Sequence, residues 1–549
     1  AGIGCHGWLA EQWAWGSGHR PTPANDVLEF AQGHRADFPA HHTGPPGSRL
    51  RRIVLERAGA VFACRAVQGR ANDSRYRCQT ACRETRWSLI GLLVKLGGSF
   101  TECRGAIMSL PSRPRPHQVT RRHFLKSTAA TTAAASTLGG SLLKSQRTLA
   151  AERLLGANER ITIGAIGVGG RARQLLEQLP ESAQIVALAD CNLPRAEEFK
   201  SEADAAWDVY QDYRYLLDRQ DIDAVIVATG EFQRVLPCIH AAQAGKDIYA
   251  EKPLTLYVRE GRALVDAVRK HERILQVGTQ QRSMAINRIA CELVRSSGLG
   301  NVLKVRAMNY SGAEASPTEY PSGEETPTGL DWDMWLNQAA WREYHPDWMG
   351  WMRWRDFAGG EMTNWGAHGI DQIQWALGTD HTGPVAMWPL TDGPSGQVAM
   401  RYAHGVEVEF VLEPGSGPMG GAVFICEGGK LEINRNKFAS NPPEIAMELK
   451  RQLDLAEEQR KWSDDVALWQ ARWHLQDWLD CIRSRELPVA DVEIGHRSVT
   501  VCHLANITRA VGRPLTWDPH QERFVNDSEA NEYLDRPRRE RFELPAASI

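Results

Sequence analysis

The sequence predicts an α/β fold: a doubly wound parallel sheet of the Rossmann type, followed by an α+β domain with a mainly antiparallel open sheet. Three observations support this. The β-branched segment 161–166 runs into Gly167-x-Gly169-x-x-Ala172, strand-like and helix-like segments then alternate up to residue 279, and hairpin-like strands dominate after residue 283. Alternating strands and helices indicate a parallel sheet, whereas successive hairpins indicate an antiparallel one.

The glycine-rich turn predicts a dinucleotide site. Gly167 permits the tight turn, Gly169 lets the backbone approach a pyrophosphate, and the small side chain of Ala172 lets the next helix pack against the strand. Gly170 and Arg171 lie in the same turn. The phosphates are expected to face the N-terminus of this helix.

The second strand, QIVALAD at 184–190, ends in Asp190. A carboxylate at that position accepts hydrogen bonds from the adenosine ribose, which favours NAD over NADP. Arg195 follows five positions later, and an arginine there can accommodate the 2′-phosphate of NADP. The sequence therefore predicts NAD, with NADP as the weaker alternative.

The alternation continues with strands at 223–230, 247–253 and 273–279. Ligands bind at the carboxyl ends of such strands, where Thr229, Glu251 and Lys252 fall. Lys252 could be an ordinary surface lysine. We favour a functional role, because burial beside a cofactor readily lowers the pKa of a lysine. The Rossmann domain is predicted to span 158–282.

A second domain is predicted at 283–525. Its expected elements are a helix at 285–297, a strand at 302–311, hairpins at 397–412 and 422–435, and helices near 465–484 and 496–511. The charged tail, 526–549, is predicted to be irregular.

Residues 359–378 read GGEMTNWGAHGIDQIQWALG and predict a helix. Asn364, His368, Asp371 and Trp375 are spaced by four, three and four positions, which places them on one helical face. From these residues alone the helix is either catalytic or an amphipathic helix with a structural histidine. Both alternatives stay open.

Tryptophan is concentrated in the same region, with eight of the nineteen between 332 and 375. These indoles either form core or stack on the C–H faces of a sugar. We expect Trp365, together with Arg282, to contact the substrate.

Together these motifs resemble the Gfo/Idh/MocA family of NAD(P)-dependent oxidoreductases. The resemblance covers 158–525 and rests on the glycine fingerprint, AGKDIYAEKPLTL, QVGTQQRS, DWDMWL, the 359–378 segment and ADVEIGHRSVTVCHLANI. The style is similar to the exported branch found in planctomycete-like bacteria. The resemblance implies that Lys252 is the active-site lysine, that Pro253 follows a cis peptide bond, and that the 359–378 segment supplies the other catalytic groups.

Two positions depart from the family pattern. Asn364 stands where members commonly have an aspartate, and an amide can orient a hydroxyl but cannot accept its proton. After Thr229, relatives often read Pro-Asp-His-Trp-His, whereas this chain has residues 230–234, GEFQR. The second departure bears on substrate preference.

The implied function is oxidation of a hydroxyl on a small carbohydrate or cyclitol, the expected partner. The proton passes to His368 or Lys252 and the hydride to the nicotinamide, while Asn364 and Asp371 orient the alcohol and the imidazole. One alternative is a glycosidase or epimerase that oxidises a carbon transiently and consumes no NAD. Another is a non-catalytic, exported carbohydrate-binding protein. A homo-oligomer is expected.

The first 107 residues differ from the rest. They hold 13 Arg, one Lys, five of the eleven Cys and no Met. We interpret 1–107 as unstructured translation of upstream DNA, with Met108 as the start of the protein. Cys78 and Cys82 have no second pair at zinc-site spacing, and no metal site is expected.

Residues 108–151 are predicted to be a twin-arginine signal peptide. TRRHFLK at 120–126 precedes an Ala/Thr-rich stretch, and the mature chain is expected to begin near Ala151. The stretch is too short and too polar for a stable membrane span. We therefore expect export to the periplasm through the twin-arginine machinery. The net charge of −3 indicates no nucleic-acid partner.

Overall fold

The computed structural model describes residues 160–545, apart from 414, 416, 436, 452 and 454–470. The predictions for the upstream segment 1–107, for Cys78 and Cys82, and for the signal peptide 108–151 with Met108 and Ala151 concern residues outside this range. None of the helices in the described part of the chain is both long and apolar enough to cross a bilayer.

The first sheet has six parallel strands in the order β3-β2-β1-β4-β5-β6. This is the doubly wound order, and it confirms the predicted Rossmann sheet. The strand order reverses between the adjacent strands β1 and β4, so ligands are expected at the carboxyl ends of these strands. The strands are β1 (Ile161–Ile166), β2 (Ala183–Ala189), β3 (Asp208–Tyr210), β4 (Ala224–Val227), β5 (Asp247–Ala250) and β6 (Leu275–Val277).

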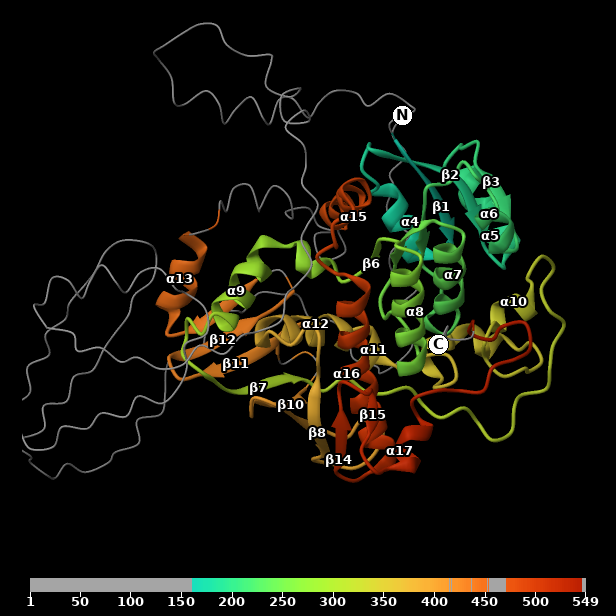
Figure 1. The fold of residues 1–549 in the computed structure, drawn as a ribbon. Coiled ribbons are helices and arrows are strands. Elements are labelled where there is room, and N and C mark those ends of the chain that lie inside the picture. The colour runs from blue at the N-terminus through green and yellow to red at the C-terminus, as the bar shows by residue number, and fades with distance from the viewer. Residues whose placement is uncertain are drawn as a thin grey trace, which may run out of the picture. The chain divides into compact units, whose positions relative to one another are not determined.

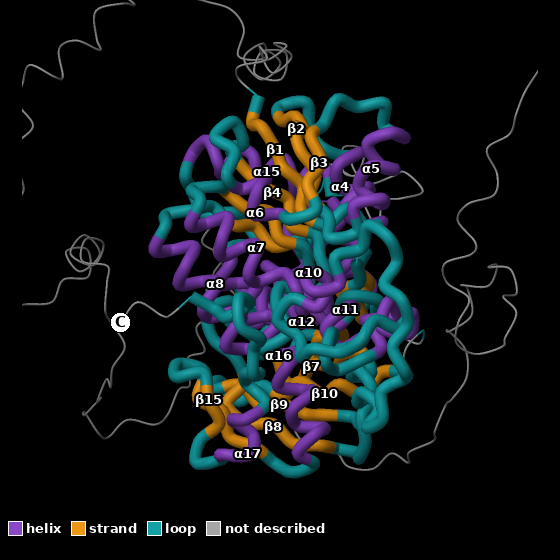
Figure 2. Tube along the Cα trace, turned by 90° about the vertical axis from the view of Figure 1, so that its right-hand side faces the viewer, coloured by secondary structure: helices purple, strands orange, loops and turns teal. Residues whose placement is uncertain are grey.

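Helices cover both faces of this sheet (Figures 1 and 2). One face packs against α6 (Tyr213–Leu217), α7 (Glu231–Gln243) and α8 (Val258–Lys270). The other packs against α4 (Gly170–Glu177), α5 (Leu193–Glu202) and α15 (Arg472–Ser484). Leu475, Trp478 and Leu479 of α15 are fully buried there. A helix from beyond the second sheet therefore completes the first layer, which the sequence did not predict.

The second sheet has nine strands in the order β13-β12-β11-β7-β10-β9-β8-β14-β15. Neighbouring strands are antiparallel except for β7 and β10, which are parallel, so the predicted mainly antiparallel sheet is confirmed. The strands are β7 (Val302–Met308), β8 (Pro384–Pro389), β9 (Val398–Tyr402), β10 (Glu407–Leu412), β11 (Ala422–Cys426), β12 (Gly429–Ile433), β13 (Phe438–Asn441), β14 (Leu515–Asp518) and β15 (Arg523–Phe524).

Apolar residues of this sheet form one core with three helices, α9 (Ala285–Arg295), α12 (Gly366–Leu377) and α16 (Val492–Val511). The helix α12 packs against both α9 and α16 and is buried almost all round. It therefore lies between the second sheet and α16, where its polar side chains must find internal partners. The remaining elements are η2 (Gln280–Ser283), α10 (Trp332–Leu336), η3 (Pro346–Arg353), α11 (Glu361–Asn364) and α13 (Pro443–Arg451).

The tail is more regular than the sequence predicts. Residues Ser528–Glu532 form α17, which Asp527 caps by accepting the Ala530 N–H. Beyond it, Arg536 and Arg538 form ion pairs with Glu260 at the start of α8, and Arg539 pairs with Asp333 of α10. Apart from α17, the described part of the tail contains no helix or strand, and these arginines tie it to carboxylates far away in the sequence.

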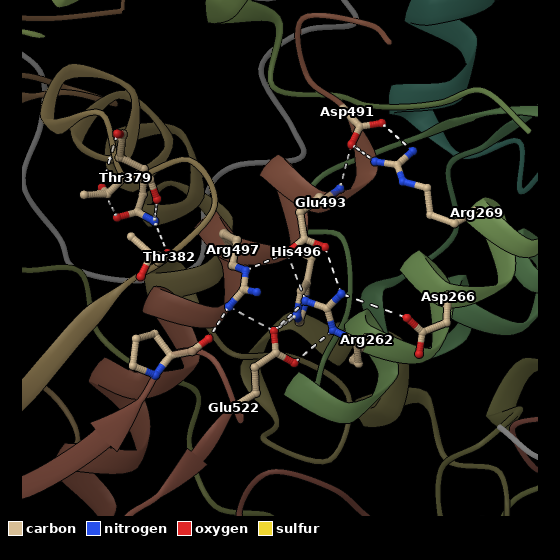
Figure 3. A network of polar contacts seen from close by, with 12 residues as sticks. Arg262, Asp266, Arg269, Thr379, Thr382, Asp491, Glu493, His496, Arg497 and Glu522 are labelled. Atoms are coloured by element: carbon tan, nitrogen blue, oxygen red, sulfur yellow. Dashed lines mark hydrogen bonds and ion pairs between the residues drawn. The ribbon is translucent and has the colours of Figure 1, made fainter. Parts of the chain in front are cut away.

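A network of charges joins α8 of the first domain to α16 of the second (Figure 3). Arg262 of α8 donates to Glu493 at 2.9 Å and to Glu522 at 2.6 Å. Glu522 also accepts from Arg497 at 3.1 Å and from His496 Nε2 at 2.8 Å. The two carboxylates thus share three cationic or N–H donors, which fixes the two helices against each other.

This network makes the stability of the fold sensitive to acid. Burial opposes ionisation of Glu493, but hydrogen bonds from Arg262 and Arg497 outweigh it and lower its pKa to about 2. The pKa of Glu522 is lowered too, since His496 and Arg262 outweigh burial. Carboxyls with lowered folded pKa values stabilise the fold above the ordinary value of 4.5 and lose that effect as pH falls through the folded value.

We expect the free energy of unfolding in urea to fall between pH 4.5 and about 2. At pH 7, Arg262→Met should lower it by about 2 kcal/mol, less than for a fully buried pair because Arg262 is partly exposed. The same substitution should make the free energy of unfolding depend less on pH in this range. Arg288→Met, at an exposed arginine, should change neither the free energy of unfolding at pH 7 nor its pH dependence. If the pH dependence of the free energy of unfolding is unchanged in Arg262→Met, groups other than Glu493 and Glu522 cause it.

Candidate functional site

The glycine-rich turn lies between the end of β1 and the start of α4. Gly167 has φ +79°, and a Cβ there would lie 2.8 Å from Thr229 Cγ2 and 3.0 Å from the Thr229 nitrogen at the end of β4. Gly169 and Gly170 differ, since a Cβ on either would meet no heavy atom within 4 Å. Gly169 is the N-cap of α4 and carries no side-chain cap. The space above these two glycines fits a pyrophosphate at a helix N-terminus.

Ala172 is buried under this turn, as predicted. Asp190 follows β2, and its carboxylate accepts the N–H groups of Val168 at 2.8 Å and Asn192 at 2.9 Å. Arg195 donates to both carboxylate oxygens, at 2.6 and 2.8 Å. Asp190 therefore holds the glycine-rich turn in place, while its outer side is covered by a guanidinium.

Glu251 is buried beside the turn, one residue beyond β5. Its carboxylate accepts from Arg171 Nε at 2.8 Å and from the Lys252 N–H at 3.0 Å. Burial raises the pKa of Glu251, but Arg171 and Lys252 outweigh it, so the pKa lies below its usual value. A buried anion thus stands between the predicted cofactor turn and Lys252.

Lys252 reaches from the first domain to the second. Its Nζ donates to Asn364 Oδ1 at 2.7 Å and to the Asn364 carbonyl at 3.3 Å. Burial lowers the pKa of Lys252 to about 8; Glu251 opposes the shift, and Arg435, Arg171 and Arg234 add to it. The Lys252–Pro253 peptide bond is cis, as the resemblance implied.

His368 lies one turn beyond Asn364, with 3% of its surface exposed. Its Nδ1 is buried without a hydrogen-bond partner among the described residues. Burial lowers the pKa of His368 well below its usual value, and the charges of Arg435 and Lys252 lower it further. The His368 imidazole is therefore uncharged at neutral pH, and its buried Nδ1 makes no hydrogen bond in the described structure. Trp365 packs against it, with ring centroids 6.1 Å apart.

The 359–378 segment is not one helix, in contrast to the prediction. It divides at Trp365 into α11 and α12, and the His368 N–H bonds the Trp365 carbonyl three residues back. Gly360, at φ +73°, packs so closely that a Cβ would lie 2.4 Å from the Ala313 nitrogen. The tight glycine turn sets the direction of α11 separately from α12.

Asp371 is not joined to Lys252 or His368 by any contact in the described structure. Its carboxylate accepts from Arg282 Nε at 2.8 Å and from Ser498 Oγ at 2.8 Å. Arg282 also donates to Asp380 at 2.7 Å and stacks on Trp375, 5.2 Å from the ring centroid. These contacts differ from the expectation that Asp371 orients the alcohol and the imidazole: Asp371, Trp375 and Arg282 tie α12 to η2 and α16. The predicted substrate contact of Arg282 has no support in this geometry.

Half of the eight tryptophans between 332 and 375 are buried: Trp332, Trp335, Trp348 and Trp375. Trp332, Trp335 and Trp348 are buried in one aromatic cluster with Phe232 and Phe357. Phe232 belongs to α7, so the cluster packs the loop-rich segment of the second domain on the first. Of the indoles between 332 and 375, Trp365 is the one that contacts His368 in the described structure.

Two residues near the site were not assigned a role from the sequence. Arg435 follows β12, is 1% exposed and lies over Trp365 at 5.5 Å. Burial lowers its pKa to about 10. Glu231 begins α7 and contacts the 359–363 turn. Its place two residues after Thr229, at the ligand edge of the sheet, was the one signal in the sequence.

The site therefore combines an open helix N-terminus, a partly buried lysine, a neutral imidazole and an amide. These groups can bind a dinucleotide, orient a hydroxyl and hold its proton. Among residues 160–545, outside the gaps, no group of three histidines, cysteines or carboxylates could hold a metal ion.

Three family models match the chain. The oxidoreductase family's NAD-binding Rossmann fold matches residues 161–279, and its C-terminal alpha/beta domain matches residues 286–544. A twin-arginine translocation pathway signal sequence matches residues 118–137.

Curated relatives match over a shorter length. Glycosyl hydrolase family 109 protein 1 of Shewanella sp. (strain MR-4) is 31% identical over 29% of this chain and 38% of its own. Inositol 2-dehydrogenase of Pseudomonas savastanoi pv. phaseolicola is 30% identical over 22% of this chain and 36% of its own. The chain thus matches little more than a third of each relative.

Among solved structures, the WlbA dehydrogenase from Bordetella pertussis, in complex with NADH and UDP-GlcNAcA, is 17% identical with a TM-score of 0.46, covering 65% of this chain and 99% of its own. Myo-inositol 2-dehydrogenase from Lactobacillus plantarum is also 17% identical, with a TM-score of 0.44, covering 65% and 99%.

Two glycine substitutions test the cofactor turn. Gly169→Ala should leave the melting temperature unchanged, because its Cβ meets open space and its φ of −67° suits any residue. It should nevertheless weaken NAD binding by roughly tenfold or more, about 1.4 kcal/mol, because the methyl group occupies the path of the pyrophosphate.

Gly167→Ala serves as the comparison for Gly169→Ala, because it is expected to change thermal stability. It should lower the melting temperature, because the new Cβ meets Thr229 at positive φ. Calorimetric titration of NAD together with thermal melts separates the two effects. Unchanged NAD affinity in Gly169→Ala would place the pyrophosphate elsewhere.

Proposed function

Because this chain belongs to the Gfo/Idh/MocA oxidoreductase family and carries its NAD-binding Rossmann domain, we propose that it oxidises a hydroxyl of a sugar, sugar derivative or cyclitol by hydride transfer. A bound nicotinamide would supply the hydride acceptor. The groups that hold the alcohol and its proton come from the chain itself.

One observation carries the proposal. Lys252 is partly buried just beyond the carboxyl end of β5, and its Nζ lies 2.7 Å from Asn364 Oδ1 of the second domain. A reacting hydroxyl that enters between them meets a proton acceptor and an amide. Since a general base works best with a pKa near the working pH, Lys252, at about 8, suits the role better than His368, whose pKa lies far lower.

In this assignment the deprotonated Lys252 accepts the hydroxyl proton. Asn364 orients the oxygen, because its amide can donate or accept a hydrogen bond but cannot take the proton. His368 stays neutral and uses its unpartnered Nδ1, or the opposite ring nitrogen, to hold the alcohol. Trp365 and Arg435 border this group and would contact the rest of the substrate.

A second candidate is a transient-redox glycosidase or epimerase, in which the oxidised carbon is reduced again after elimination or inversion. Relatives named as glycosyl hydrolases and as inositol dehydrogenases match the chain to a similar extent, which keeps both candidates. The twin-arginine signal supports export to the periplasm, where no pool of NAD is at hand for recycling. A protein that folds before export can carry its nucleotide along.

We expect protein purified from the exported fraction to carry NAD(H). Adding candidate sugars and cyclitols should change the absorbance of the reduced nicotinamide. A lasting change indicates a dehydrogenase, whereas product without net change indicates transient redox chemistry. Sugar binding without hydride exchange would favour the carbohydrate-binding alternative over both.

Lys252→Met and His368→Ala should each slow hydride transfer by roughly 10²–10⁴-fold and leave the nucleotide bound. Lys430→Met, at an exposed lysine on β12, is the matched control and should not change the rate. Hydride transfer at the full rate in Lys252→Met would remove Lys252 from the proposed chemistry.

Preference for NAD over NADP rests on Asp190, and tolerance of NADP on Arg195. Titration of nucleotide-free protein with both cofactors should show tighter binding of NAD. Asp190→Ala should reduce the difference between the affinities for NAD and NADP. Arg195→Ala exposes the Asp190 carboxylate. This substitution should increase the ratio of NAD affinity to NADP affinity by roughly tenfold. Tighter binding of NADP to the unmodified protein would overturn the assignment.

A further inference from the structure

Glu231 is a buried carboxyl group at the junction of the two domains. It is the first residue of α7, follows the end of β4 and is 2% exposed. Its Oε1 accepts the Gly359 N–H at 2.8 Å and the Thr363 hydroxyl at 3.3 Å. Its Oε2 is buried and has no hydrogen-bond partner in the described structure.

No cation pairs with this carboxyl group in the described part of the chain. Arg234, one turn along α7, donates to the carbonyls of Pro253 and Thr229. Lys252 donates to Asn364. A buried carboxylate with one N–H donor, one hydroxyl donor and an unsatisfied oxygen is costly, whereas the protonated acid is not charged.

The contacts of Glu231 lie next to those of Lys252. Gly359 and Thr363 are held by Glu231 at the end of β4, and the next residue, Asn364, is held by Lys252 at the end of β5. The same turn is fixed from the other side, where Asn506 of α16 donates to the Gly359 carbonyl at 2.8 Å. The position of Asn364 opposite Lys252 therefore depends on the contact between Glu231 and the turn.

We propose that Glu231 is held as a neutral, protonated acid and is a positioning residue of the site: while it is uncharged the 359–364 turn stays packed over it, and its ionisation puts a charge with one unsatisfied oxygen into the junction, which water can reach only if the turn lifts and moves Asn364 away from Lys252. The reaction consumes no proton of Glu231. The effect is a loss of order at the site as the pH rises.

The charged and titratable groups around Glu231 fit this assignment. Burial raises its pKa to about 8, against the opposing effects of the Gly359 N–H, Arg234, Thr363 and Lys252. Cys502 of α16 also faces it, and the burial of that thiol keeps it neutral by raising its pKa. A carboxyl with a raised folded pKa stabilises the fold least at high pH, since stability falls as the pH rises from 4.5 through about 8.

Glu231→Gln tests the proposal, because glutamine resembles the neutral acid, can accept the Gly359 N–H and cannot ionise. The melting temperature of the variant relative to the unmodified protein should rise between pH 5 and pH 9. Glu292→Gln, at an exposed carboxyl on α9, should show no such trend. A constant difference across this range overturns the proposal. This measurement does not depend on the proposed function.

The activity measurement rests on the proposed function. The rate of hydride transfer should rise as Lys252 loses its proton and fall at higher pH as Glu231 ionises. In Glu231→Gln the rate of hydride transfer should still rise as Lys252 loses its proton, but it should no longer fall at alkaline pH. A fall in the rate at alkaline pH that persists in the variant contradicts the proposal. If no hydride transfer is found but the melting temperature of Glu231→Gln relative to the unmodified protein rises with pH as expected, the proposed function is rejected. The assignment of Glu231 as a protonated acid is then still supported.

If Glu231→Gln does not fold, Thr363→Val tests whether Glu231 is the group that ionises at alkaline pH. The valine removes a hydroxyl donor that favours the ionised form, so the loss of thermal stability at alkaline pH should move to higher pH. An unmoved alkaline loss would overturn the proposal, because Glu231 would then not be the group that titrates.

Discussion

The contact between the short helix α11 and the ends of two neighbouring Rossmann strands is the interaction on which the site depends. Thr363 meets Glu231 after β4, and Asn364 meets Lys252 after β5. Each pair joins residues more than a hundred positions apart. The relative placement of lysine, amide and imidazole is therefore a property of the domain junction. A shift of the junction by the length of a hydrogen bond would separate them.

The rest of the second domain holds α11 in that place. Gly360 lies so close to the backbone at 312–313 that no side chain fits, and Asn506 bonds the preceding carbonyl. Arg282 and Asp371 fix α12 below it, while the Arg262 network fixes α16 to α8. The Arg282–Asp371 pair is buried and the Arg262 network is partly buried, and in both the charges are paired, so their contribution is to geometry more than to net stability.

The electrostatics of the site follow from burial. Lysine, histidine and arginine have lowered pKa values there, and Glu231 has a raised one, because each charged form lacks water. Glu251 and Arg171 are exceptions, because their ion pair lowers the pKa of the carboxyl and raises that of the guanidinium. Titratable groups whose pKa values are moved toward neutrality are characteristic of sites that transfer protons.

The sequence by itself determined the features that depend on near neighbours: the glycine turn after β1, the strand ends that carry Thr229 and Lys252, and the hairpins of the second sheet. Helical spacing also grouped Asn364 with His368. The same spacing wrongly added Asp371, because periodicity gives a direction but not a partner. Tertiary structure alone decided that Asp371 pairs with Arg282, that α15 covers the first sheet, and that Glu231 reaches the 359–363 turn. The physical reason is that a buried polar group must be paired, and its partner comes from whichever distant segment folding brings alongside.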